Sequence, residues 1–138
     1  MLPLHASVAE LEGLDVPSGA YGMGSLAWLS RALVSPLGQL GPADLRLLLG
    51  HGRGLRWLLP VALERLEREP FAGGDHGPGE LLTAALAVDP AAWAADPSWL
   101  PRLAAVVATA RAQVHVLPER VRGRVAGDLE AVRELFGF

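Results

Sequence analysis

The sequence contains no cysteine, no lysine, no asparagine and no isoleucine among its 138 residues. Without cysteine the chain can form neither a disulfide nor a thiolate metal site, and it cannot use a cysteine nucleophile. Arginine supplies all 12 basic residues and 15 acidic residues outnumber them, so the formal net charge is −3. This balance excludes the strongly basic surface that is typical of nucleic-acid-binding domains, and we expect no nucleic-acid partner.

The chain also lacks a long apolar run, although 51% of its residues are hydrophobic. No stretch approaches the ~18 apolar residues that a membrane-spanning helix needs. The first ten residues carry no basic segment and include His5 and Glu10, which argues against a secretory signal. We therefore expect a soluble, cytoplasmic protein without membrane contact, and 138 residues suit one domain spanning 1–138.

Glycine and proline divide the chain into segments with helical periodicity. Ser25, Asp89 and Asp96 are expected N-caps, and the last two are each followed by a proline suited to a first helical turn. No convincing strand appears, since the only β-like run, residues 114–117, is too short for a sheet. Helices are expected over 7–13, 25–35, 41–50, 53–69, 80–88, a turn around Trp93, 97–110 and 118–136.

The segment 53–69 has the clearest apolar face and contains Pro60. A proline inside a helix removes one backbone hydrogen bond and clashes with the preceding turn, so we predict a kink there. The fold class predicted from these patterns is all-α: a single-domain helical bundle of about seven helices, one of them kinked at Pro60.

Residues 50–54 read Gly-His-Gly-Arg-Gly, a composition compatible with a loop that binds phosphate through backbone N–H groups. The segment lacks both the preceding strand and the Lys-Ser/Thr pair of a nucleotide-binding loop. A tight turn between two helices, in which glycines adopt positive φ, explains the same residues more simply.

Asp75, His76 and Glu80 form a second cluster that could act as an acid–base pair or as part of a metal site. No nucleophile lies nearby, and the other histidines do not have metal-ligand spacing. A simpler interpretation is that Asp75 shapes a turn and Glu80 lies in the first turn of a helix, where the dipole favours an acid. No catalytic residue, cofactor or metal is predicted, and we do not expect an enzyme.

The acidic residues are unevenly spread along the chain. Between residues 64 and 96, seven acidic residues and two arginines give a local net charge of −5. Residues 102–138 carry six arginines and four acids. Because these arginines have no interleaved aromatic residues, a solvated helix face is favoured over phosphate contacts.

Several segments, taken in order, resemble a known family. They are Ala-Glu-Leu-Glu-Gly at 9–13, Pro36-Leu37, Asp-Leu-Arg-Leu-Leu-Leu-Gly-His at 44–51, the run 54–66, Pro70-Phe71, Gly74-Asp75, residues 78–82 and Trp93. Their order and spacing over about 9–105 resemble the helical immunity proteins of contact-dependent growth inhibition systems. His51-Gly52 and His76-Gly77 depart from that pattern, which indicates a different cognate toxin.

The resemblance implies a bacterial protein that performs no chemistry and binds the C-terminal domain, often a nuclease, of a large polymorphic toxin delivered by a neighbouring cell. It would block the toxin's active site or an adjacent surface. A nuclease presents a cationic cleft, so we expect the acidic stretch to supply the contacts. The expected toxin-contacting residues are Glu67, Glu69, Asp75, His76, Glu80, Asp89 and Asp96.

Two alternatives stay open. One is a self-associating scaffold, which size-exclusion chromatography would reveal, and the other comes from a different class of function. A small-ligand-binding or enzymatic helical domain would use the loops 50–54 and 75–80. That alternative predicts a concave pocket where the two loops converge.

Overall fold

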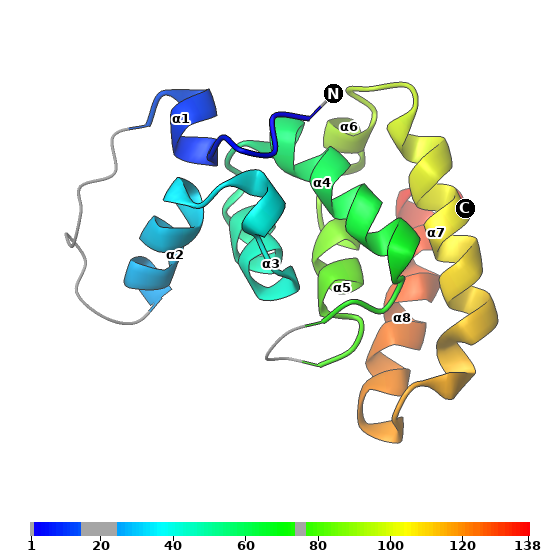
Figure 1. The fold of residues 1–138 in the computed structure, drawn as a ribbon. Helices are drawn as coiled ribbons and strands as arrows, with labels where there is room; N and C mark the ends of the chain where they lie inside the picture. The colour runs from blue at the N-terminus through cyan, green and yellow to red at the C-terminus, as the bar shows by residue number, and fades with distance from the viewer. Residues whose placement is uncertain (1, 15–24, 74–76) are drawn as a thin grey trace.

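The computed structural model describes residues 2–14, 25–73 and 77–138, and their secondary structure is helical throughout (Figure 1). The all-α prediction is confirmed, with a somewhat larger number of helices than expected. In chain order the elements are α1 (Val8–Glu12), α2 (Ser25–Val34), the 3₁₀ helix η1 (Leu37–Gln39), α3 (Pro42–His51), α4 (Leu55–Arg68), α5 (Glu80–Leu86), α6 (Pro90–Trp93), α7 (Trp99–Gln113), the 3₁₀ helix η2 (Val114–Val116) and α8 (Glu119–Leu135).

Short polar side chains begin two of these helices, α1 and α6, by accepting hydrogen bonds from backbone N–H groups that have no helical partner. The Ser7 hydroxyl accepts from the N–H of Glu10 at 3.1 Å, and the Glu10 carboxylate accepts from the N–H of Ser7 at 3.2 Å. Asp89 caps α6 by accepting from the N–H of Ala91 at 2.9 Å. The predicted N-cap at Asp89 is therefore confirmed.

The start of α7 differs from the prediction. Its N-cap is Ser98 rather than Asp96, and the helix begins at Trp99. The Asp96 carboxylate accepts from the N–H of Ser98 at 2.8 Å and from the Ser98 hydroxyl at 2.7 Å. Asp96 thus closes a turn just before the helix, because its short side chain reaches the backbone two residues ahead.

Helix α4 is central and packs against α3, α5, α6 and α7. Its buried residues cover more than one face, since neighbouring helices shield it on several sides. Pro60 lies inside this helix and is buried, and the kink there stays a prediction. The buried residues of α4 are Leu58, Leu59, Pro60, Val61, Ala62, Leu63 and Leu66.

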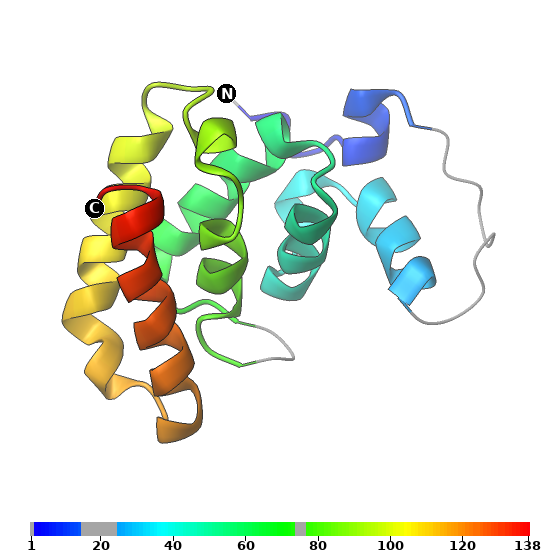
Figure 2. The same cartoon turned by 180° about the vertical axis from the view of Figure 1, so that it is seen from behind.

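Helices α7 and α8 form an antiparallel hairpin that η2 connects, at the opposite end of the molecule from α1 and α2 (Figures 1 and 2). The hairpin packs through α7 onto α4 and through α8 onto α5. Phe136, which follows α8, is only half-buried, whereas both helices bury apolar residues at helical spacing. They comprise Trp99, Leu103, Val106, Val107 and Ala110 on α7, and Val121, Val125, Leu129 and Val132 on α8.

Trp93 occupies the core beside α5. Its side chain is completely buried, and its indole N–H donates to the backbone carbonyl of Ala85 at 3.0 Å. A buried indole keeps its polar atom satisfied in this way. Within the described ranges, no helix is both long and apolar enough to span a bilayer.

Candidate functional site

Glu67 on α4 and Arg102 on α7 form a two-pronged ion pair at the surface. Arg102 Nη2 lies 2.7 Å from Glu67 Oε1, and Arg102 Nε lies 3.1 Å from Glu67 Oε2. The hydrogen bond from Arg102 lowers the pKa of the Glu67 carboxyl, and the same bond raises the pKa of the Arg102 guanidinium. The pair therefore fixes a negative and a positive charge across the α4–α7 boundary.

Two further carboxylates lie close to the same guanidinium. The negative charges of Glu64 and Asp96 both help to raise the pKa of Arg102. Hydrogen bonds from Ser98 lower the pKa of Asp96, so its carboxylate is ionised at neutral pH. Three carboxylates thus act on one guanidinium, Glu67 by direct contact and Glu64 and Asp96 through their charge, and the sum of these four charges is negative. We call Glu64, Glu67 and Asp96 the carboxylate cluster.

A cavity of about 670 Å³ adjoins the carboxylate cluster, between the N-terminal residues, α4 and the start of α7. The guanidinium of Arg56 lies 4.6 Å from the ring centroid of Trp57, both at the cavity wall. The indole N–H of Trp57 is buried and, among the described residues, meets no acceptor. The lining residues are Leu2, Pro3, Arg56, Trp57, Pro60, Glu64, Ala95, Asp96, Trp99 and Arg102.

The structure distributes the predicted contact residues over several places. Glu67 pairs with Arg102, and Asp96 lines the same cavity as Arg102. Glu69 is exposed at the C-cap of α4, and Asp89 is exposed at the N-cap of α6. Asp75 and His76 lie outside the described residues.

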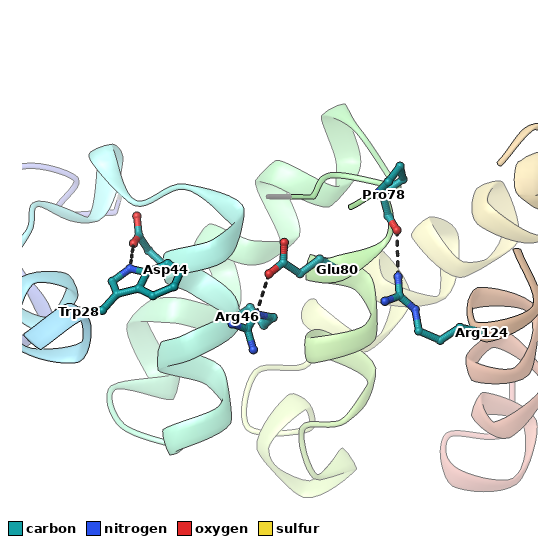
Figure 3. A network of polar contacts seen from close by, with 6 residues as sticks. All are labelled: Trp28, Asp44, Arg46, Pro78, Glu80 and Arg124. Carbon is teal, nitrogen blue, oxygen red and sulfur yellow. Dashed lines mark hydrogen bonds and ion pairs between the residues drawn. The ribbon is translucent and has the colours of Figure 1, made fainter. Parts of the chain in front are cut away.

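Glu80 is placed differently from the exposed acids (Figure 3). It begins α5, as predicted, but only 2% of its surface is accessible. Its Oε1 atom lies 2.6 Å from Nε of Arg46 on α3. A carboxylate enclosed in this way does not face a partner, because the packing of α3 on α5 covers it. Its role in the described structure is to join these two helices.

Sequence reasoning missed Glu64, Arg102 and Trp57 as members of the site. Glu64 stands three residues before Glu67 on α4, and this spacing puts both side chains on one helix face. That signal was available in the sequence. The approach of Arg102 was not, because it depends on how α7 packs against α4.

Residues 52–54 form the interhelical turn of the simpler interpretation, while Gly50 and His51 still belong to α3. Gly52 ends α3 with φ +70° and Gly54 precedes α4 with φ +67°. A Cβ atom at Gly54 would lie 2.7 Å from Val8 Cγ1, so the turn also allows close contact with α1. Glycine is required there by both the backbone conformation and the space.

The convergence expected by the small-ligand alternative is seen only in part. Gly50 and Glu80 line one hollow of about 380 Å³. Gly52, Arg53 and Gly54 line another, of about 370 Å³. No group of three or more histidine or acidic side chains able to hold a metal is found in the part of the chain that the structure describes.

Several C-terminal arginines bind backbone carbonyls, so the α8 region is not simply a solvated charged face. Arg111 Nη2 donates to the carbonyl of Leu129 at 3.0 Å. Arg124 Nη2 donates to the carbonyl of Pro78 at 3.0 Å (Figure 3). These contacts tie α7 to α8, and α8 to the residues before α5.

A family model described as "CDI immunity proteins", where CDI is contact-dependent growth inhibition, matches residues 10–103. The match runs from α1 into the first turns of α7, and it includes the whole carboxylate cluster with Arg102. The remainder of α7, η2 and α8 lie beyond it. No curated protein and no solved structure matches the chain.

Proposed function

Because this chain belongs to the family of CDI immunity proteins, which neutralise toxins, we propose that it neutralises a nuclease toxin domain by covering the active site or an adjacent surface. The observation that carries the proposal is the carboxylate cluster beside an open cavity, inside the matched region. The chain would act as a stoichiometric inhibitor in the cytoplasm and perform no chemistry itself.

Charge gives this surface a physical role in binding. A nuclease collects cationic groups around the phosphate that it cleaves, and exposed carboxylates attract those groups over a range of about 8–10 Å at physiological salt. Glu67 and Glu69 are exposed and close in sequence at the end of α4. We include Asp89, Asp96, Asp75 and His76 in the proposed contact surface, while Glu80 belongs to the packing of α3 on α5.

The test is co-expression with the toxin domain encoded next to this chain. Survival of cells that die when the toxin domain is expressed alone, together with a stoichiometric complex, would support the proposal. We expect a Kd in the nanomolar range or lower, about −12 kcal/mol. A purified chain that neither binds the toxin domain nor restores viability would refute it.

The electrostatic contribution is tested by association rates. The variant Glu67→Gln/Glu69→Gln removes two charges from the proposed face, and Glu130→Gln/Glu134→Gln removes two exposed charges from α8. We expect the first variant to slow association several-fold at low salt, with the difference shrinking as salt rises. Equal rates for the two variants would place the toxin on another surface.

A further inference from the structure

The cavity beside the carboxylate cluster has both the size and the walls of a binding pocket. Its volume of about 670 Å³ lies within the roughly 300–1,000 Å³ typical of ligand pockets. Trp57, Trp99 and Pro60 supply apolar surface, while Glu64 and Asp96 supply carboxylates. A guest that combines a flat cation with an apolar stem would match both kinds of wall.

The lining holds two carboxylates, those of Glu64 and Asp96, and two guanidiniums, those of Arg56 and Arg102. Arg102 is already paired with Glu67, so its charge is largely compensated. Glu64 and Asp96 form no ion pair within 4 Å among the described residues. Arg56 is also cationic, but its side chain is exposed and lies over the Trp57 ring. Two carboxylates therefore remain available at the wall for an incoming positive charge.

Trp57 gives the cavity an aromatic wall. Its indole N–H is buried without an acceptor among the described residues, which is unfavourable for a buried donor. The Arg56 guanidinium at 4.6 Å shows that the ring accommodates a guanidinium on its face. Because Arg56 is exposed, its side chain can move aside and uncover the face of the Trp57 ring.

We propose that this cavity receives an arginine residue of the cognate toxin. The guanidinium pairs with Glu64 and Asp96, and its planar group stacks on the Trp57 ring in place of Arg56. Arginine fits better than lysine, because its planar guanidinium stacks on aromatic rings and bridges carboxylates. This inference rests on the proposed function, since it names the group by which the toxin would be held. A toxin arginine that binds the substrate phosphate would then be bound by this cavity instead.

The pocket is tested in the complex with the adjacent toxin domain, using two variants that act differently. Glu64→Gln/Asp96→Asn removes the two charges, and the amide oxygen introduced at position 96 can still accept from Ser98. Ala95→Phe fills the cavity from an exposed position without changing charge. We expect each variant to raise the Kd for the toxin domain roughly tenfold or more. The first loses a buried charge pair, and the second blocks the space that the guest needs. Glu130→Gln/Glu134→Gln is the matched charge control and should bind as the wild type does.

Labelling of toxin arginines with phenylglyoxal then identifies the guest. We expect one toxin arginine to be protected in the wild-type complex and to become reactive in the Glu64→Gln/Asp96→Asn complex. In ¹⁵N spectra the Trp57 indole N–H, assigned with Trp57→Phe, should shift when the complex forms.

Three outcomes would overturn the inference. If the wild type binds while both pocket variants bind equally well, the cavity is not the binding pocket, although the proposed function stands. If the variants weaken binding but no toxin arginine is protected in the wild-type complex, the arginine assignment is wrong. If the wild type forms no complex, the proposed function fails together with the pocket's role in it.

Discussion

Arg46 Nε lies 2.6 Å from Oε1 of Glu80, and this ion pair joins α3 to α5 at a point where the Glu80 side chain is only 1% exposed (Figure 3). Burial of a carboxylate is costly unless a cation and hydrogen bonds compensate it. Arg46 keeps 33% of its side chain exposed, so its own charge remains hydrated. The pair holds an acidic residue inside the bundle that composition alone would place on the surface.

Replacing Arg46 by methionine should destabilise the protein by about 2 kcal/mol, less than the 3–5 kcal/mol seen for breaking fully buried pairs. Methionine keeps the apolar stem but removes the cation facing Glu80. Urea unfolding followed by circular dichroism measures the loss. Glu80→Gln, which retains an acceptor oxygen without the charge, should cost less. A cost for Arg46→Met below that of Glu80→Gln would contradict the role assigned to this pair.

Trp93→Phe should lower the free energy of unfolding by about 1–2 kcal/mol. The phenyl ring fills most of the space but loses the hydrogen bond to the Ala85 carbonyl. Trp93→Ala should cost about 3–5 kcal/mol, because it leaves a cavity in a completely buried site. Thermal and urea unfolding of both variants distinguishes the hydrogen-bond contribution from that of volume. Equal losses of unfolding free energy for Trp93→Phe and Trp93→Ala would contradict this division between the hydrogen bond and the side-chain volume.

Gly79→Ala should destabilise the contact between α8 and the start of α5. Gly79 has φ +84°, and an added Cβ would lie 2.8 Å from Val125 Cγ2. We expect a loss of about 1–3 kcal/mol from strain and displacement of α8. Gly123→Ala is the matched control on α8, where a Cβ would meet nothing within 4 Å, and it should stabilise by about 0.5–1 kcal/mol. The two variants should therefore shift the denaturant midpoint in opposite directions.

The Glu67–Arg102 pair predicts a small pH dependence of stability. The pKa of Glu67 is lowered in the folded state by its hydrogen bond to Arg102. A lowered carboxyl pKa contributes stability above the unfolded pKa, and this contribution is lost as pH falls through the folded pKa. Because Glu67 is largely exposed, the effect should be below about 1 kcal/mol.

Urea unfolding of the wild type and Glu67→Gln between about pH 7 and pH 3 measures that contribution. The wild type should be the more stable at pH 7, and the difference should shrink toward pH 3. A difference that grows on acidification would show that the sign of the pKa shift is wrong.

Local patterns predicted most of the helices. The spacing of Leu103, Val106, Val107 and Ala110 marks the buried face of α7 whatever lies opposite, because helical periodicity is a property of the sequence. Asp89 and Pro90 start α6 for equally local reasons. Asp96 was the exception, since its own turn with Ser98 delayed the helix by a few residues.

The candidate site could be found only in part. The acidic stretch, the exposure of Glu67 and Glu69 and the family resemblance follow from the order of residues, and the match over 10–103 confirms the last of these. Which acids gather is a different matter. Glu67 pairs with Arg102 because α7 folds back along α4, and Arg102 comes from a segment 35 positions away.

The sequence by itself determined the helices, most of their boundaries, the family and an acidic middle segment, because each of these depends on neighbours along the chain. The tertiary structure decided which acids are available to a partner. Glu67 and Glu80 are the same residue type, yet one is exposed beside a cavity and the other is buried against Arg46. Packing of α3 on α5 and of α7 on α4 makes that difference, since burial depends on residues that are distant in sequence.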